Sequence, residues 1–260
     1  MRFIAVTGTG TGVGKTVTTA ALASCALRAG QRVAVVKPVQ TGVRPGEPGD
    51  LAEVRRLTGL DDLHEYVRYA EPLAPATAAR RLGDPGPALD ELAGRIAGLA
   101  DRDLVIVEGA GGALVRFNDR DEGMAELIGA VQELVRSPSG DGRSPRVEVV
   151  LVTGANLGCL HHAAATARAL EEWGLAPGHL VVGDWPAEPG LAERCNLQDL
   201  PSYGGAPLRG VLPSGAGRLL PEAFAEVAVR SLTPALGGSF DAVSFVRRHA
   251  APEPMRVSSP

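Results

Sequence analysis

The strongest constraint on the fold is an alternation of short apolar, β-branched runs with segments of helical periodicity. The apolar runs predict strands over residues 3–7, 32–37, 104–107, 147–153, 180–182 and 208–211. Between them, apolar residues at helical spacing predict helices over 15–29, 50–58, 88–99, 123–135, 160–173 and 220–232. Because neighbouring parallel strands need crossover connections, this order predicts an α/β fold with a mainly parallel, doubly wound sheet and helices on both faces.

Length and composition favour one domain. The chain has 260 residues, of which 45% are hydrophobic, enough for one sizeable core. We expect a single domain over residues 1–250. The Ser-, Gly- and Pro-containing segment 137–145 is expected to be a surface loop insertion within it, and residues 251–260 a disordered tail.

The charge pattern favours a small-molecule partner. The formal net charge is −4 and no long basic run occurs, which argues against nucleic acid or an anionic membrane as the main partner. The N-terminus has no signal-peptide pattern and no apolar run reaches membrane-spanning length, so we expect a cytoplasmic protein. Cys25, Cys159 and Cys195 are odd in number and lack a zinc-binding spacing, so we expect free thiols.

A glycine-rich loop follows the first predicted strand and leads directly into a helical segment. Residues 8–16 read Gly-Thr-Gly-Thr-Gly-Val-Gly-Lys-Thr. Glycines let successive backbone N–H groups and the helix N-terminus face one phosphate. Lys15 adds a positive charge for the β- and γ-phosphates, and the Thr16 hydroxyl can bind Mg²⁺. This context predicts a P-loop NTPase-like fold, whereas a plain strand-to-helix turn leaves the Gly-Lys-Thr sequence unexplained. Five residues separate Gly8 from Gly14, one more than in the common form of the loop.

Three further motifs follow this loop in order. They are Lys-Pro-Val-Gln-Thr-Gly at 37–42, Val-Glu-Gly-Ala-Gly-Gly at 107–112 and Leu-Gly-Cys-Leu-His-His at 157–162. Together with the long loop, they resemble the dethiobiotin synthetase family over residues 3 to about 213. Residues 182–190, Val-Gly-Asp-Trp-Pro-Ala-Glu-Pro-Gly, resemble its actinobacterial branch.

The resemblance implies a role for each matching residue. The nucleotide-binding residues would be Gly8, Thr9, Gly10, Thr11, Gly12, Val13, Gly14, Lys15, Thr16, Val17, Asp184 and Pro213. The substrate-binding residues would be Thr11, Lys37, Thr41, Glu108, Cys159, Leu160 and His161. Thr16, Asp50 and Glu108 would be the metal ligands, and Lys15, Lys37 and Thr41 the catalytic residues. Thr41 keeps the hydroxyl that other members of the family carry on Ser.

The local sequence supports some of these roles and leaves structural alternatives for others. Glu108 follows an apolar strand and would project from the carboxyl edge of the sheet, where α/β folds bind ligands. Asp50 could instead be the N-cap of the helix that continues at Leu51. Lys37, before Pro38, could instead be a solvated lysine at the edge of the sheet.

The residues that open the predicted helix 160–173 also have two interpretations. Free N–H groups in a first helical turn can hold a carboxylate, and the resemblance implies the fatty-acid carboxylate of the substrate. Ordinary first-turn packing accounts equally for His161. Cys159 is better explained as a small packed residue than as a nucleophile, because no His/Asp arrangement accompanies it.

Asp184 departs from the family pattern, in which ATP-specific members carry Asn. A carboxylate accepts hydrogen bonds but cannot donate one to adenine N7. Asp184 therefore predicts a relaxed or altered base preference, with GTP or CTP comparable to ATP or better. In the alternative, Asp184 faces solvent or caps the turn at Trp185-Pro186 and does not read the base.

The resemblance also implies a reaction and its partners. The co-substrate would be ATP or another nucleoside triphosphate, with Mg²⁺ as cofactor. One amine of 7,8-diaminononanoate captures CO₂ (from bicarbonate) as a carbamate, which attacks the γ-phosphate. The second amine then displaces phosphate and closes the urea ring of dethiobiotin. The family is homodimeric, with each substrate site completed at the interface.

Two other functions remain as alternatives. One is an ATP-dependent amide-forming enzyme of the cobyrinic acid diamide synthase type, which usually carries a glutaminase domain that this length does not accommodate. The other is a regulatory partitioning ATPase, which typically has a second lysine where this chain has Thr9 or Thr11.

Overall fold

A single parallel sheet forms the centre of the molecule. The computed structural model describes residues 1–136 and 147–251, and the expected 137–145 insertion and nearly all of the expected tail lie outside them. The strand order is β3-β2-β4-β1-β5-β6-β7, and every neighbouring pair is parallel. The strands are β1 (Arg2–Gly8), β2 (Val33–Thr41), β3 (Leu63–Tyr69), β4 (Leu104–Glu108), β5 (Val147–Thr153), β6 (His179–Trp185) and β7 (Leu208–Pro213). The predicted α/β fold is confirmed.

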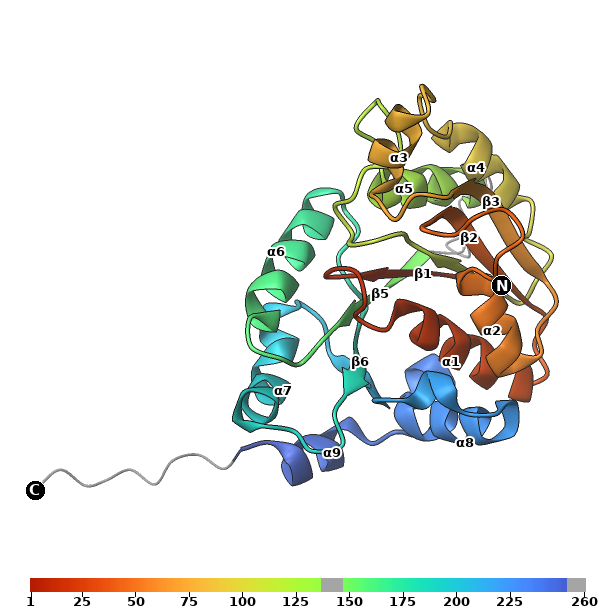
Figure 1. The fold of residues 1–260 in the computed structure, drawn as a ribbon. Helices are drawn as coiled ribbons and strands as arrows, with labels where there is room; N and C mark the ends of the chain where they lie inside the picture. The colour runs from red at the N-terminus through yellow and green to blue at the C-terminus, as the bar shows by residue number, and fades with distance from the viewer. Residues whose placement is uncertain (137–146, 252–260) are drawn as a thin grey trace, which may run out of the picture.

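Helices cover both faces of the sheet, as Figure 1 shows. They are α1 (Lys15–Arg28), α2 (Asp50–Thr58), α3 (Pro75–Arg81), α4 (Leu89–Ala97), α5 (Met124–Val135), α6 (Cys159–Glu172), α7 (Leu191–Tyr203), α8 (Pro221–Ser231) and α9 (Ala242–His249). Helices α1, α2 and α8 share one core cluster with the sheet, α3, α4 and α5 a second, and α6 and α7 a third.

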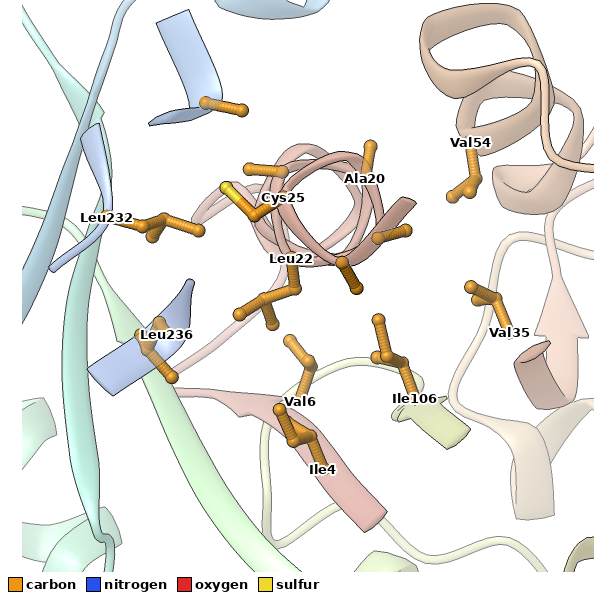
Figure 2. Packing of buried hydrophobic residues seen from close by; sticks show 14 of the residues in the cluster. Ile4, Val6, Ala20, Leu22, Cys25, Val35, Val54, Ile106, Leu232 and Leu236 are labelled. Atoms are coloured by element: carbon orange, nitrogen blue, oxygen red, sulfur yellow. The ribbon is translucent and has the colours of Figure 1, made fainter. Parts of the chain in front are cut away.

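The alternation of side chains along each strand builds these cores. On β1, Ile4 and Val6 pack toward α1, whereas Phe3 and Ala5 pack toward α4 and α5. Figure 2 shows Leu22 of α1 directed toward Val6 and Ile4. A continuous apolar run with both faces covered is typical of a buried parallel strand.

The strand register determines where the functional residues can meet. Val6 of β1 is paired with Glu108 of β4, and Val36 of β2 is paired with Val107 of β4. Lys37 and Glu108, one residue further along each strand, therefore lie level with each other at the carboxyl edge. The loop that joins β1 to α1 starts at this same edge, which brings three of the sequence motifs together.

The sequence missed four elements, namely β3, α3, α7 and α9. In β3, Glu65 and Arg68 form an ion pair along an edge strand whose residues are mostly half-buried, so the apolar signal is weak. In α7, Pro201 lies inside the helix, and polar residues surround the buried positions of this helix.

Ala251, the first residue of the expected tail, is buried and donates its backbone N–H to the carbonyl oxygen of Arg194. Within the described residues, no helix is long and apolar enough to cross a membrane.

Candidate functional site

A pocket of about 730 Å³ opens at the carboxyl ends of β1, β2 and β4. Its wall includes the predicted site residues Thr11, Gly12, Gly14, Lys15, Thr16, Val17, Lys37, Thr41, Asp50 and Glu108. Gln40, Pro72, Leu73, Ala74, Pro75 and Val115 also line it. The topology thus gathers residues from three separate motifs around one space.

The loop between β1 and α1 has the backbone conformation that its glycines allow. Gly12 and Gly14 have φ angles of 76° and 93°, in the left-handed region that favours glycine. The loop is anchored at its start, where the N–H of Thr9 donates to Val152 and the carbonyl of Gly8 accepts from Ala113. α1 begins immediately afterwards, so its N-terminus faces the pocket, as a phosphate site requires.

Lys15 is the first residue of α1, and its side chain turns back into this loop. Its Nζ donates to the carbonyl oxygen of Gly10 at 2.8 Å, and the residue is 8% exposed. Burial, together with the positive charge of Lys37, lowers the pKa of Lys15 to about 8. An anionic phosphate in the pocket would replace the carbonyl as partner and favour the charged form of this side chain.

Lys37 stands between two carboxylates. Its Nζ lies 2.5 Å from Oδ2 of Asp50 and 2.8 Å from Oε1 of Glu108, and it donates to the carbonyl oxygen of Gly109 at 3.0 Å. Burial alone would lower the pKa of Lys37, but the charges of Glu108 and Asp50 hold it above its usual value. Lys37 is 3% exposed, so the alternative of a solvated edge lysine is wrong.

Glu108 also accepts from the other side of the pocket. The hydroxyl of Thr16 donates to its Oε1 at 2.8 Å, so Thr16 and Lys37 share one carboxylate oxygen. Its Oε2 is buried and has no hydrogen-bond partner among the described residues. A buried carboxylate oxygen without a partner is costly unless a donor or a cation satisfies it when ligand binds.

The oxygen atoms of Thr16, Asp50 and Glu108 fit a Mg²⁺ ion. Magnesium in nucleotide sites is held by one or two carboxylates, a hydroxyl and phosphate oxygens, and it keeps several waters. No group of three or more His, Cys, Asp or Glu residues suited to a metal occurs in the described ranges 1–136 and 147–251, and such a group is not needed here. Asp50 is the first residue of α2 and Gly49 is its N-cap, so the capping alternative for Asp50 is wrong.

The start of α6 does not line this pocket. Cys159 is buried, and burial raises the pKa of its thiol to about 11, which fits the predicted packing role rather than a nucleophile. Leu160 is half-buried against the third core cluster. His161 is exposed, with its ring 5.7 Å from that of His162. The predicted carboxylate-binding residues therefore lie apart from Lys37 and Thr41 within one chain.

Comparison with known proteins decides the family. A protein named ATP-dependent dethiobiotin synthetase BioD from Frankia casuarinae is 54% identical over 96% of this chain and 99% of its own length. The proteins of the same name from Streptomyces coelicolor and Mycobacteroides abscessus are 48% and 42% identical, over 96% and 90% of this chain and 99% and 96% of their own lengths. This chain belongs to the dethiobiotin synthetase family. A family model described as an AAA domain matches residues 2–135.

Solved structures support the fold independently of the family. The MinC:MinD complex of Aquifex aeolicus matches with a TM-score of 0.51 at 12% identity, covering 97% of this chain and 98% of that chain. The septum site-determining protein MinD of Pyrococcus horikoshii also gives 0.51, at 17% identity, covering 95% of this chain and 93% of that chain. At such identities the likeness concerns the fold alone. The relatives named as synthetases favour the dethiobiotin synthetase interpretation over both alternatives.

The predicted base-reading residues of this dethiobiotin synthetase family member lie at the ends of β6 and β7. Asp184 is exposed, and its Oδ1 accepts from the hydroxyl of Ser214 at 2.6 Å. Pro213 is paired with Trp185 across the two strands. Neither Asp184 nor Pro213 lines the pocket around Lys37. Gly183, just before Asp184, lies directly against the backbone of Val13 and Gly14 in the P-loop.

Sequence reasoning overlooked three features of this dethiobiotin synthetase-family site. The buried amide of Gln40 and the apolar wall from Pro72 to Pro75 line the pocket without any motif of their own. The third feature had a clear signal, because Lys15 and Lys37 are the only lysines in the chain and every other side chain counted as Lys or Arg is arginine. The rarity of lysine is a signal that composition gives, and it adds to the motifs that identified these two residues.

Proposed function

We propose that this protein is a dethiobiotin synthetase, a ligase that uses a nucleoside triphosphate and CO₂ to close the urea ring of dethiobiotin on 7,8-diaminononanoate. The observation that carries the proposal is the arrangement of Lys37 between Asp50 and Glu108, beside the P-loop, in a chain of this family. Such a site combines a phosphate-binding loop with a second buried cation, as a reaction between a carbamate and a γ-phosphate requires.

In the proposed reaction, one substrate amine attacks CO₂ and loses a proton, which forms a carbamate. The ammonium of Lys37 and the hydroxyl of Thr41 hold this anion in line with the γ-phosphate, which Lys15 and the loop N–H groups bind. A carbamate oxygen attacks phosphorus, and the nucleoside diphosphate leaves. The second amine then attacks the carbamoyl carbon, phosphate departs and the attacking nitrogen loses a proton to phosphate or water, so no protein nucleophile is needed. Positioning and charge stabilisation supply the catalysis.

We further propose that Thr16, Asp50 and Glu108 hold Mg²⁺ together with the nucleotide. A bound Mg²⁺ would neutralise charge on the β- and γ-phosphate oxygens. The unpartnered Oε2 of Glu108 supports this assignment. The loop residues from Gly8 to Val17 would surround the phosphates, and Asp184 and Pro213 would lie toward the base. We also propose a cytoplasmic location, where nucleoside triphosphates are supplied.

A homodimer is proposed because one chain does not bring its own α6 to the pocket. Cys159, Leu160 and His161 are absent from the lining around Lys37, while Leu114 and Leu157 are exposed apolar side chains on loops near the carboxyl edge of the sheet. A partner subunit could present the first turn of its α6 to the substrate carboxylate. Activity regained on mixing inactive Lys15→Ala chains with inactive His161→Glu chains would support such shared sites.

The function is tested with purified protein, 7,8-diaminononanoate, bicarbonate, Mg²⁺ and a panel of nucleotides. Mass spectrometry should detect dethiobiotin in amounts that match the released phosphate, and the Lys15→Ala variant should form none. Nucleotide hydrolysis that depends instead on DNA or lipid, with no dethiobiotin, would favour the partitioning ATPase. Amide formation on another acid would favour the diamide synthase type.

A further inference from the structure

Gln40 is a buried amide on β2 that links two residues of the proposed site. It is 4% exposed and lines the pocket. Its Oε1 accepts from the backbone N–H of Asp50 at 2.9 Å, and its Nε2 donates to the carbonyl oxygen of Thr41 at 3.0 Å. Only this orientation of the amide satisfies both neighbours, because the reverse would place donor against donor and acceptor against acceptor.

The hydrogen bond to Asp50 replaces a missing helix cap. Helix α2 begins at Asp50, and its N-cap, Gly49, provides no side-chain acceptor. The first N–H groups of a helix have no intrahelical partner, and a Ser, Thr, Asp or Asn at the N-cap usually satisfies one of them. Here Gln40 supplies that acceptor from a neighbouring strand. A Cβ on Gly49 would lie 2.9 Å from Oε1 of Gln40 and 3.1 Å from Nη2 of Arg68, so a side chain at the N-cap would push against both groups.

A second contact holds the chain that leads into α2. Nη1 of Arg68, on β3, donates to the carbonyl oxygen of Glu47 at 2.7 Å and to that of Arg44 at 3.1 Å. Glu65 orients the same guanidinium through two hydrogen bonds. The connection between β2 and α2 is therefore fixed from β3 in its middle and from Gln40 at its end.

We propose that Gln40 is a positioning residue, whose amide fixes the first residue of α2 so that the Asp50 carboxylate faces Lys37 and the bound Mg²⁺. This inference rests on the proposed function for the presence of Mg²⁺. Asp50 has a half-exposed side chain, with 36% exposure, and without an anchor it could turn toward solvent. Gln40 acts through Asp50 and Thr41 and contacts no reacting atom.

The first test is Gln40→Leu, which replaces the amide with an apolar side chain of similar volume and removes both hydrogen bonds. Partners that orient a metal ligand typically contribute about 10- to 100-fold to metal affinity. We therefore expect the Mg²⁺ concentration for half-maximal binding of a fluorescent nucleoside diphosphate to rise roughly tenfold, with the same shift in turnover. Gln198→Leu, exposed on α7, is the matched control and should change neither value.

A double-mutant cycle with Asp50→Asn separates positioning from a general structural effect. If Gln40 acts through Asp50, then Gln40→Leu should change Mg²⁺-dependent nucleotide binding by at most about twofold in the Asp50→Asn background. Equal effects in both backgrounds would overturn the proposal. Gly49→Ala pushes against Oε1 of Gln40 and, less closely, against Nη2 of Arg68. It should also raise the Mg²⁺ requirement, and it serves if Gln40→Leu does not fold.

The outcome for Gln40 is independent of the outcome for the reaction. An unchanged Mg²⁺ requirement in folded Gln40→Leu and Gly49→Ala variants would contradict the positioning role even if dethiobiotin is formed. If the parent protein forms no dethiobiotin, the proposed function fails. The cycle on Mg²⁺-dependent nucleotide binding would then still decide whether Gln40 positions Asp50.

Discussion

Gly14 in the P-loop and Gly183 in β6 approach so closely that neither position has room for a side chain. A Cβ on Gly14 would lie 2.3 Å from the carbonyl oxygen of Gly183, and a Cβ on Gly183 would lie 2.2 Å from that of Val13. The loop thus rests on the backbone of a strand that lies two positions away from β1 in the sheet. The position of the P-loop depends on β6 as well as on β1.

This contact predicts that Gly183→Ala displaces the loop. Gly183 is not among the glycines with positive φ, so the substitution tests steric contact without added backbone strain. Overpacking of this kind costs about 1–3 kcal/mol of stability. We expect at least about a tenfold loss of nucleotide affinity, measured by calorimetry, since a rigid phosphate cradle loses its backbone geometry.

Gly94→Ala in α4 is the control for this prediction. A Cβ there meets nothing within 4 Å, and alanine in a helix is favoured over glycine by about 1 kcal/mol. The control should therefore raise the melting temperature and leave nucleotide affinity unchanged. Wild-type affinity in Gly183→Ala would show that β6 does not support the loop.

The sequence predicted most of the sheet because its strands are buried on both faces and read as continuous apolar runs. β3 was not predicted because it is an edge strand that carries the Glu65–Arg68 ion pair in place of apolar residues. The roles of Lys15, Lys37, Thr41 and Glu108 came from motifs that resemble a known family, and these residues line one pocket because the parallel strands that carry or precede them end at one edge.

What the sequence could not provide was contact between residues distant along the chain. Gln40 has no motif of its own, and its role depends on the position of Asp50, which lies across a loop. In the sequence, nothing distinguishes Gly183 from another glycine in an apolar strand. Its contact with Gly14 is evident only in the folded structure. Relations of this kind follow from strand order and register, which sequence periodicity does not determine.

Removal of charge at the proposed metal ligands should change the Mg²⁺ requirement. Glu108→Gln and Asp50→Asn each remove one negative oxygen ligand, so we expect the half-saturating Mg²⁺ concentration to rise by roughly tenfold or more in each variant. Glu108→Gln also leaves Lys37 with one fewer anionic partner, which should lower the unfolding free energy by a few kcal/mol. Turnover measured over a range of Mg²⁺ concentrations gives the metal requirement, and thermal unfolding gives the change in stability. An unchanged titration would assign that residue to a structural role.

Nucleotide affinity should fall as pH rises through the pKa of Lys15. This pKa is about 8 in the nucleotide-free pocket, and phosphates raise it because they favour the ammonium form. Below about pH 7 the side chain is already charged, and its contribution to affinity is constant. Above pH 8 binding must take up a proton, and affinity falls by up to about tenfold per pH unit until the pKa of the bound state is reached.

Calorimetry near pH 8.5 in buffers of different ionisation enthalpy measures this proton uptake. Lys15→Ala should abolish the uptake at Lys15 together with turnover, while its circular dichroism spectrum remains that of the parent. Equal proton uptake in the variant would assign the titration to another group.

Base preference should depend on Asp184. The hydroxyl of Ser214 donates a hydrogen bond to Oδ1 of Asp184, and Oδ2 of Asp184 has no partner among the residues that the structure describes. The neighbouring Gly183 lies against the P-loop, so this carboxylate stands at the end of the strand on which the P-loop rests. A carboxylate can accept from an exocyclic amine or from the two donors on one edge of guanine, but it opposes N7 of adenine, another acceptor. We therefore expect GTP or CTP to support turnover comparably to ATP or better.

The decisive comparison is kcat/KM for ATP, GTP and CTP in the parent and in Asp184→Asn. The Asn amide can donate to N7 and accept from the adenine amine, so the variant should shift toward ATP by about 3- to 10-fold, as expected for a net hydrogen bond of about 0.5–1.5 kcal/mol. Ser214→Ala removes the hydroxyl but keeps the carboxylate, and it should retain the preference of the parent. Indifference to the base in both proteins would mean that Asp184 only binds Ser214 and faces solvent. A strong preference of the parent for ATP that Asp184→Asn leaves unaltered would show that the base is read elsewhere.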